Sequence, residues 1–260
     1  MRRFRYSAIN NKSLSKNAGH QFAATHALCH YKSETIYSFI PKVACSTMRV
    51  SMAIANGCIS GPEDYIWIHQ NNATFRASLR DLATAKFTFV ILRDPLARLV
   101  SVYLDKIVDR TPVYWSFDIN TNRQFEPDSI TFRLFVEELS KGQIKQNIHW
   151  RPQVDFLVYK DYDLWIPLER FSQHQDVLQE RTGIIIHDAR QLTKHGNDQY
   201  QLNRDQCFAD ISPAEIRSMR RDGLSPDGEK MFDDRLRKIA QNLYEKDIEL
   251  YGSKFGSQLS

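Results

Sequence analysis

Two short segments of the sequence combine residue types that bind oxyanions with the start of a predicted helix. The first is Pro41-Lys42-Val43-Ala44-Cys45-Ser46-Thr47, between a strand predicted over 36–40 and a helix predicted over 47–56. Backbone N–H groups at a helix start attract anions, Lys42 adds a positive charge, and Ser46 and Thr47 add hydroxyl donors. The segment therefore fits a phosphate group, but it lacks the glycines of a Walker A loop. Taken alone, it is explained more simply by a Ser/Thr helix cap beside a surface lysine.

The second segment runs from Arg93 to Ser101, where an apolar strand predicted over 86–92 becomes a helix with Pro95 in its first turn. Arg93 ends the strand and offers a fork of N–H donors to an oxyanion. In open α/β sheets, ligands bind beyond the carboxyl ends of the strands. A surface pair between Arg93 and Asp94 is the simpler alternative. Two such segments, each after a predicted strand, favour a ligand with two phosphate-like groups.

The elements that must position these segments alternate between strand and helix along the chain. Apolar periodicity predicts further helices over 131–140 and 172–180, a strand over 163–167, and one terminal helix over 227–251. This alternation predicts an α/β fold, with helices packed around a mostly parallel central sheet. Two further segments, 111–130 and 187–211, have few periodic apolar positions and are predicted as loops.

The composition describes one globular domain preceded by a basic segment. The chain has 260 residues, of which 42% are hydrophobic and 25% charged, and its formal net charge is +4. Residues 1–32 hold six basic and no acidic residues, so the domain predicted over 33–260 carries a slightly negative charge. This balance disfavours a nucleic-acid partner, and we expect the basic segment to be a solvated extension.

No apolar run reaches the length of a membrane span, and the residues after Met1 do not form a secretory signal. We therefore expect a cytoplasmic protein that is not integral to a membrane. The four cysteines show neither metal-binding spacing nor a disulfide framework, so no metal site is expected.

Three motifs, in this order, resemble the carbohydrate sulfotransferase family that includes the chondroitin 4-O- and HNK-1 sulfotransferases. They are Ile40-Pro41-Lys42-Val43-Ala44-Cys45-Ser46-Thr47, Phe89-Val90-Ile91-Leu92-Arg93-Asp94-Pro95-Leu96-Ala97-Arg98-Leu99-Val100-Ser101-Val102-Tyr103, and Asn147-Ile148-His149-Trp150-Arg151-Pro152-Gln153. The resemblance extends over residues 36–251. It implies a three-layer, P-loop-like fold that uses 3′-phosphoadenosine 5′-phosphosulfate (PAPS).

The resemblance implies transfer of a sulfonate group from PAPS to a hydroxyl of a carbohydrate or glycoconjugate. By similarity, Lys42, Ser46 and Thr47 would hold the 5′-phosphosulfate, with Lys42 neutralising the leaving oxygen. The remaining cofactor-binding residues of that loop would be Pro41, Val43, Ala44 and Cys45. Arg93 and Ser101 would hold the 3′-phosphate. The family requires no metal.

Two histidines are candidates for the base that removes the proton of the acceptor hydroxyl. His149 lies in the third motif, and a hydrogen-bonded histidine packed against Trp150 is its structural alternative. His69 lies in a polar run before the Arg93 strand, roughly where related heparan 2-O-sulfotransferases place a catalytic histidine. Lys194-His195-Gly196 could complete the nucleotide pocket, although the simpler explanation of these charged residues is that they lie in an exposed loop.

The chain departs from the vertebrate members, which are Golgi proteins with a membrane anchor and lumenal disulfides. We therefore expect a soluble, bacterial relative, and the predicted acceptor loops over 57–80 and 108–130 do not name its acceptor. Tyr114, Trp115 and Phe117 either stack on sugar rings or belong to the core.

Two other classes of function remain open. One is a P-loop-like nucleotide kinase or NTPase, and the other is a non-catalytic module that binds an anionic partner through the basic segment. The oligomeric state does not follow from the sequence.

Overall fold

The computed structural model describes residues 2–7, 13–71, 73–121, 125–189 and 199–256. The chain divides into two compact units. The first unit comprises Met1–Arg93, Gln153–Lys194 and Tyr251–Ser260, and the second comprises Asp94–Pro152 and His195–Leu250.

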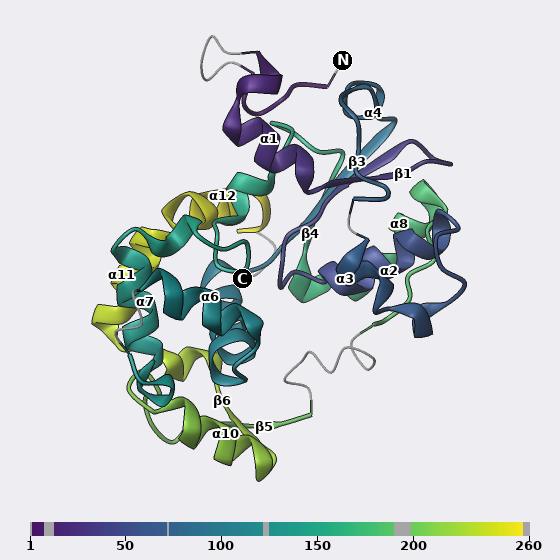
Figure 1. Ribbon diagram of the computed structural model, residues 1–260. Helices are drawn as coiled ribbons and strands as arrows, with labels where there is room; N and C mark the ends of the chain where they lie inside the picture. The colour runs from purple at the N-terminus through teal and green to yellow at the C-terminus, as the bar shows by residue number, and fades with distance from the viewer. Residues whose placement is uncertain (1, 8–12, 72, 122–124, 190–198, 257–260) are drawn as a thin grey trace. The chain divides into compact units, whose positions relative to one another are not determined.

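The first unit is built on a four-stranded sheet (Figure 1). Its strands, in spatial order, are β1 (Ala27–His30), β2 (Thr35–Ser38), β3 (Phe87–Leu92) and β4 (Leu164–Pro167). The last three are parallel to one another, and β1 pairs with β2 in the antiparallel direction. Nearly all residues of β3 are buried, as its continuous apolar sequence requires of a central parallel strand. The predicted α/β fold with a mostly parallel central sheet is confirmed.

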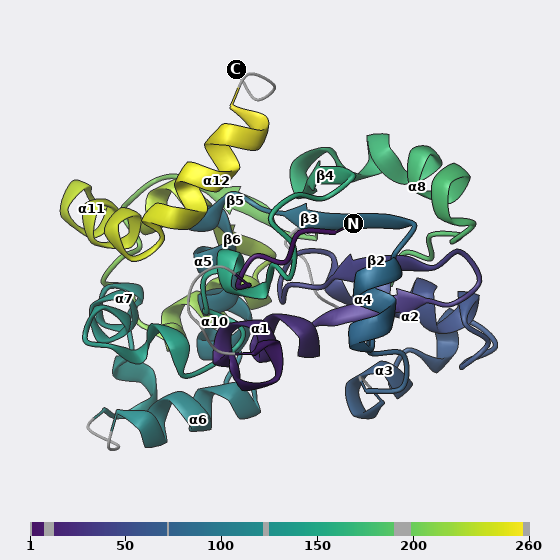
Figure 2. The ribbon, with the colours of Figure 1, turned by 90° about the horizontal axis from the view of Figure 1, so that it is seen from above.

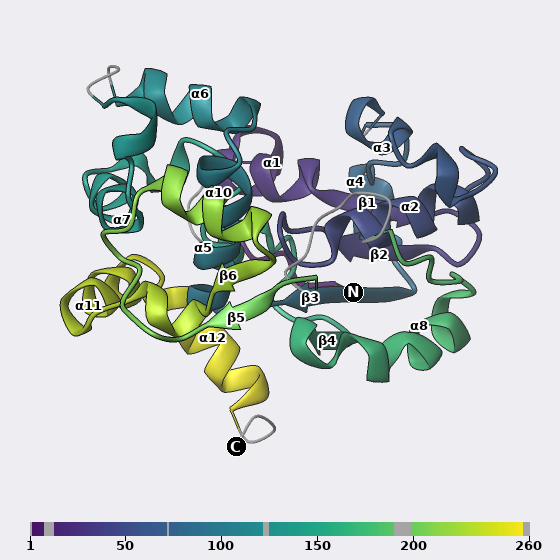
Figure 3. The ribbon, with the colours of Figure 1, turned by 90° about the horizontal axis from the view of Figure 1, so that it is seen from below.

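Packing elements cover both faces of this sheet. The helices of the unit are α1 (Ala18–Thr25), α2 (Cys45–Ala55), α3 (Trp67–Gln70), α4 (Leu79–Thr84) and α8 (Gln175–Thr182). Ser38 and Phe39 point to opposite faces because successive side chains alternate along extended backbone. The Ser38 hydroxyl lies 2.7 Å from that of Tyr162, whereas the guanidinium of Arg49 on α2 lies 5.3 Å from the centre of the Phe39 ring. Helix α3 lies beside α2 (Figure 3).

The described part of the basic N-terminal segment is bound to the first unit. Arg2 donates to the carbonyl oxygens of Ala85 and Lys86 and to the carboxylate of Asp163. The backbone of Phe4 bridges to Tyr159, and the two rings stack 5.8 Å apart. Residues 2–6 are therefore not a solvated tail. Strand β1, which also lies within the first 32 residues, is one of the two edge strands of the sheet.

The second unit is mainly helical. Its elements are α5 (Pro95–Val102), a π-helical turn (Tyr103–Val108), α6 (Pro112–Asn120), α7 (Phe132–Ser140), α10 (Pro213–Arg221), α11 (Asp234–Leu243) and a parallel pair of short strands, β5 (Gln201–Asn203) and β6 (Leu224–Pro226). Helix α12 (Glu245–Phe255) begins in this unit and ends in the first. Helices α7 and α11 lie side by side (Figure 2) over a core in which Phe117 and Phe135 pack edge-on against Trp150.

Three predictions about these elements are wrong. The segment predicted as a loop over 187–211 contains the strand β5. The segment predicted as a loop over 111–130 contains α6, which begins with Pro112 in its first turn. Tyr114 and Phe117 of this helix are buried and Trp115 is 54% exposed, so its apolar residues do not form the single stripe that identifies a helix in a sequence. The predicted terminal helix is interrupted at Tyr244, which has φ −113° and ψ 22° and donates its hydroxyl hydrogen to the carbonyl of Trp150 at 2.5 Å.

Candidate functional site

The parallel pairing of β2 with β3 brings the two predicted anion-binding segments to one edge of the sheet. Ser38 at the end of β2 is in register with Val90 of β3, so both strands end at the same side. The loop over 41–44 follows β2, and Arg93 follows β3 directly. The Arg93 side chain lies next to the first loop, because its Nη1 is 3.4 Å from the carbonyl oxygen of Lys42.

The loop over 41–44 has an unusual backbone for residues other than glycine. Lys42 has φ 67° and Ala44 has φ 48°, both in the left-handed region. Left-handed residues that alternate with ordinary ones turn successive N–H groups toward one side, a geometry that binds anions. The burial of Pro41 and Val43 holds this conformation, while Lys42 and Ala44 are half-buried.

Helix α2 starts immediately after this loop, and the side chain of its N-cap residue does not cap it. Its N-cap residue is Ala44, which offers no hydrogen-bond acceptor to the free N–H groups of the first turn. These N–H groups and the helix dipole favour a negatively charged ligand at this end. The absence of a Ser/Thr cap argues against the simpler interpretation of this segment as a capped helix.

The predicted residues of the first turn of α2 differ in their surroundings. Cys45 and Ser46 are half-buried. Thr47 is 7% exposed, and its Oγ1 accepts the backbone N–H of Ala189 at 3.4 Å. Ser51, one turn further on, accepts the N–H of His187 at 2.9 Å. The Thr47 hydroxyl therefore also attaches a neighbouring segment to α2.

Gln153 fixes the backbone of Arg93, a role that sequence reasoning missed. Its Oε1 accepts the N–H of Arg93 at 3.1 Å, and its Nε2 donates to the Arg93 carbonyl at 2.8 Å. Gln153 is 1% exposed. Its place at the end of the Asn147–Gln153 motif was the available signal, because a buried glutamine needs partners for both ends of its amide.

His69 lies in the first unit on α3. The buried guanidinium of Arg49 donates to the carbonyl of Ile68 and so ties α3 to α2. The His69 side chain is exposed at the surface.

The Asp94–Ser101 segment belongs to the second unit. The carboxylate of Asp94 accepts the N–H of Ala97 at 2.8 Å and so caps α5, which assigns Asp94 a structural role. Ser101 is half-buried on α5.

Arg98 anchors the segment that carries His149. Its side chain is only 1% exposed, and it donates to the carbonyl oxygens of His149 at 2.8 Å and of Arg151 at 2.9 Å. A buried guanidinium is stable only when such acceptors surround it. Arg98 was not among the predicted site residues, and its contact with this segment was not predicted from the sequence.

Asn147 sets the tautomer of His149. Its Oδ1 accepts the backbone N–H of His149 at 3.0 Å and lies 2.7 Å from the ring Nδ1. Because the amide oxygen only accepts, Nδ1 carries the proton, and Nε2 is then the basic nitrogen of the ring. The half-buried His149, as a neutral imidazole, therefore has an Nε2 that can accept a proton. The hydrogen bond of Nδ1 is a feature that the structural alternative also expects, and Trp150 next to His149 is a core residue.

Several expectations concern other kinds of site. Lys194-His195-Gly196 lies outside the described residues. Within the described ranges, no group of three or more His, Cys, Asp and Glu side chains is placed to hold a metal ion. Among the described helices, none has both the length and the apolar character needed to cross a membrane.

Comparison with known proteins assigns the family. The model of the sulfotransferase family matches residues 25–254. Carbohydrate sulfotransferase 14 of Danio rerio is 23% identical over 181 residues, which cover 62% of this chain and 49% of the relative. Carbohydrate sulfotransferase 14 of Homo sapiens is 25% identical over 142 residues, which cover 49% of this chain and 38% of the relative.

The matched part of the chain thus corresponds to half or less of the length of these relatives. No solved structure gives a significant match. Because the family model covers most of the chain, the protein belongs to the sulfotransferase family.

Proposed function

We propose that this protein transfers a sulfonate group from PAPS to a hydroxyl of a carbohydrate or glycoconjugate. The observation that carries the proposal is the meeting of two oxyanion-binding features at one edge of the sheet: the left-handed loop before α2, whose N-cap residue is an alanine, and the side chain of Arg93 beside Lys42. A nucleotide with phosphate groups at its 3′ and 5′ positions needs two such features. The names of the relatives support a carbohydrate acceptor.

The proposed roles follow from the chemistry of each group. The N–H groups of the loop and of the first turn of α2, with the Ser46 hydroxyl, bind the 5′-phosphosulfate in a P-loop-like manner without glycines. Arg93 binds the 3′-phosphate through its planar guanidinium. By the same resemblance, Ser101 also binds the 3′-phosphate. Ser101 belongs to the second unit. The Ser101→Ala variant tests its contribution to nucleotide affinity separately.

The proposed reaction is an in-line displacement at sulfur. The acceptor oxygen forms a bond to sulfur while the bond between sulfur and the bridging oxygen of the 5′-phosphate breaks, which leaves 3′-phosphoadenosine 5′-phosphate. Lys42 neutralises the charge that develops on that bridging oxygen. The proton of the acceptor hydroxyl passes to a histidine, for which the Nδ1–H tautomer favours His149 over His69.

The competing functions make different predictions. A nucleotide kinase or NTPase requires turnover of ATP with magnesium, and we expect none. A module that binds an anion through the basic segment requires free arginines there. Arg2 and Arg3 instead form ion pairs with Asp163 and Asp161, both at 2.6 Å, which weighs against such a module.

The direct test is incubation of the protein with radiolabelled PAPS and a panel of glycans, glycolipids and phenols. The proposal requires label on at least one glycan, with release of 3′-phosphoadenosine 5′-phosphate. Transfer to phenols alone would contradict the carbohydrate acceptor. ATP hydrolysis with magnesium and no sulfonate transfer would support the kinase or NTPase class instead.

A further inference from the structure

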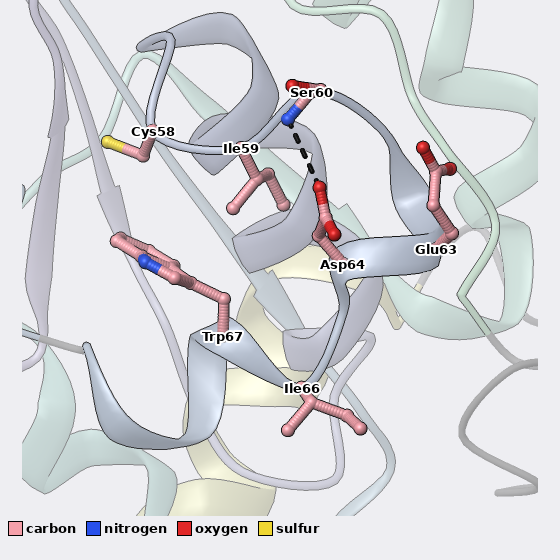
Figure 4. Close-up of a pocket in the computed structure, with 7 residues that line it drawn as sticks. All are labelled: Cys58, Ile59, Ser60, Glu63, Asp64, Ile66 and Trp67. Atoms are coloured by element: carbon pink, nitrogen blue, oxygen red, sulfur yellow. Dashed lines mark hydrogen bonds between the residues drawn. The ribbon is translucent and has the colours of Figure 1, made fainter.

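A pocket of about 470 Å³ opens at the surface of the first unit (Figure 4). Its size is within the range of pockets that bind small ligands. It is formed by the segment that follows α2 and by the start of α3, which includes part of the predicted acceptor loop over 57–80. It lies beyond the carboxyl end of α2, whereas the proposed phosphosulfate loop lies at the amino end. The length of the 11-residue helix, about 16 Å, separates these two ends.

One side of the pocket is an aromatic and aliphatic surface. The indole of Trp67 lines it together with the side chains of Ile59 and Ile66. Phe75, which is 2% exposed, stacks on Trp67 with the ring planes 11° apart and the centroids 6.3 Å apart. This backing holds the indole in place, so the pocket has a fixed aromatic platform. Ile66 is 61% exposed, which leaves apolar surface available at the rim.

The other side of the pocket is acidic. Asp64 faces Trp67 across Ile59 (Figure 4), and its carboxylate is oriented by the backbone N–H of Ser60 at 3.4 Å. Glu63 lies at the rim, and the neighbouring Gly61 leaves it room, because a Cβ at position 61 would collide with the Glu63 carboxylate. None of the described residues that line the pocket is a lysine or an arginine.

These two sides together determine the class of ligand. The carboxylates repel phosphate, sulfate and uronate groups and accept hydrogen bonds from hydroxyls, while an indole packs against the apolar face of a sugar ring. Two carboxylates are too few ligands to hold a metal ion by themselves. We infer that this pocket is a subsite for an uncharged sugar unit of the acceptor, at a distance from the unit that receives the sulfonate. This role as an acceptor subsite rests on the proposed function.

Direct binding of sugars tests the inference without any turnover. The probes are three uncharged hexasaccharides (chitohexaose, maltohexaose and cellohexaose) and a hyaluronan hexasaccharide, in which every second unit is a uronate. Saturation-transfer difference NMR should detect at least one uncharged probe, with an affinity about tenfold higher than that for hyaluronan. Absence of binding by all uncharged probes, or equal binding of hyaluronan, overturns the inference.

Two variants locate the binding. Trp67→Ala should weaken binding of the uncharged probe about tenfold, whereas Leu202→Ala, which removes an exposed apolar side chain of the second unit, should leave that binding unchanged. The surface double variant Glu63→Gln/Asp64→Asn should improve hyaluronan binding, and it keeps the inference testable if Trp67→Ala does not fold. Equal effects of Trp67→Ala and Leu202→Ala on binding of the uncharged probe, or no gain for hyaluronan, count against the pocket.

Calorimetry with 3′-phosphoadenosine 5′-phosphate separates this inference from the proposed function. The pocket variants should bind the nucleotide as the wild type does, because the pocket lies at the other end of α2. If the wild type binds sugars but not the nucleotide, the proposed function fails and the sugar site remains. If it binds the nucleotide but no uncharged sugar, only the subsite fails.

Discussion

Lys42 is the residue on which the proposed chemistry depends most directly. Its ammonium group is proposed to stabilise charge that appears on the bridging oxygen only as the bond to sulfur breaks. Lys42→Ala should therefore lower kcat about 10²–10³-fold, the usual cost of losing one charge-stabilising group. Transfer of label from PAPS at saturating nucleotide measures this effect. Lys160→Ala, at an exposed position of the same unit, is the control, and an equal loss in both variants would argue against the role of Lys42.

His149 and Asn147 have different proposed roles, which substitutions can distinguish. His149→Ala should lower kcat about 10²–10⁴-fold and leave nucleotide affinity unchanged, because a general base acts on the acceptor proton. Asn147→Ala should lower kcat less and alter the pH profile of kcat, whereas Asn147→Asp keeps an acceptor for Nδ1–H and should restore part of the rate. His69→Ala is measured alongside. Full turnover of both histidine variants at neutral pH would refute the assignment of the base.

At the scale of elements, the loop over 41–44 stores backbone strain that a substitution can increase or relieve. Ala44 has φ 48°, which is unfavourable for a β-branched residue and acceptable for glycine. Ala44→Val should lower the free energy of unfolding by about 1–2 kcal/mol or more, and Ala44→Gly should change it by less than about 1 kcal/mol. Urea denaturation measures both. The control Ala83→Val, at an exposed position of α4, should cost about 0.5 kcal/mol. A similar cost at positions 44 and 83 would mean that the loop is not strained.

The N-terminal segment should contribute to stability through Arg2. Burial acts to raise the pKa of Asp163, but the hydrogen bonds from Arg2 and Thr88 outweigh it and hold the pKa below its ordinary value of 3.8. Arg2→Ala should lower the free energy of unfolding at neutral pH by about 1–2 kcal/mol, since it also leaves two carbonyl groups without this donor. Urea denaturation measures the loss, and Arg80→Ala, at an exposed position, is the control.

The same contact predicts a dependence on pH. A carboxylate with a lowered pKa stabilises the folded state above the pKa of the unfolded chain, and this contribution is lost as the pH falls through the folded value. The difference between the wild type and Arg2→Ala should therefore shrink below pH 3.8. A difference that stays constant with pH would mean that the ion pair with Asp163 contributes nothing.

At the scale of the whole molecule, the residues with proposed roles are divided between the two units. Lys42, Arg93 and His69 belong to the first, and Ser101 and His149 belong to the second. Activity, nucleotide binding and unfolding are therefore measured on the whole chain.

The parts of the fold that could be predicted are those with strong local signals. The buried run of β3 has strand length, and the Arg93-Asp94-Pro95 sequence after it marks a helix start, which the Asp94 cap bears out. Helix α6 was missed because its buried and exposed aromatic residues alternate without a clear stripe. The break at Tyr244 was missed because the apolar stripe continues through it, and the hydrogen bond that Tyr244 donates to Trp150, 94 residues away in the sequence, leaves no local pattern.

The same distinction applies to the site. The loop over 41–47 and Arg93 stand out because their residue types suit oxyanions. Gln153, Arg98 and Asn147 act through contacts with the backbone or with a neighbouring ring, and such contacts have no signature in residue type. The pocket beside Trp67 depends on how the segment after α2 folds back onto α3, which no local pattern specifies.

The central claim is that the loop over 41–47 and Arg93 together bind one nucleotide. Calorimetric titration with 3′-phosphoadenosine 5′-phosphate tests it most directly, on the wild type and on Arg93→Ala. Our account predicts a single class of binding sites in the wild type and an affinity at least about tenfold lower in the variant, the effect of removing a charged hydrogen-bonding partner. Absence of binding to the wild type, or equal affinity in both proteins, would contradict it.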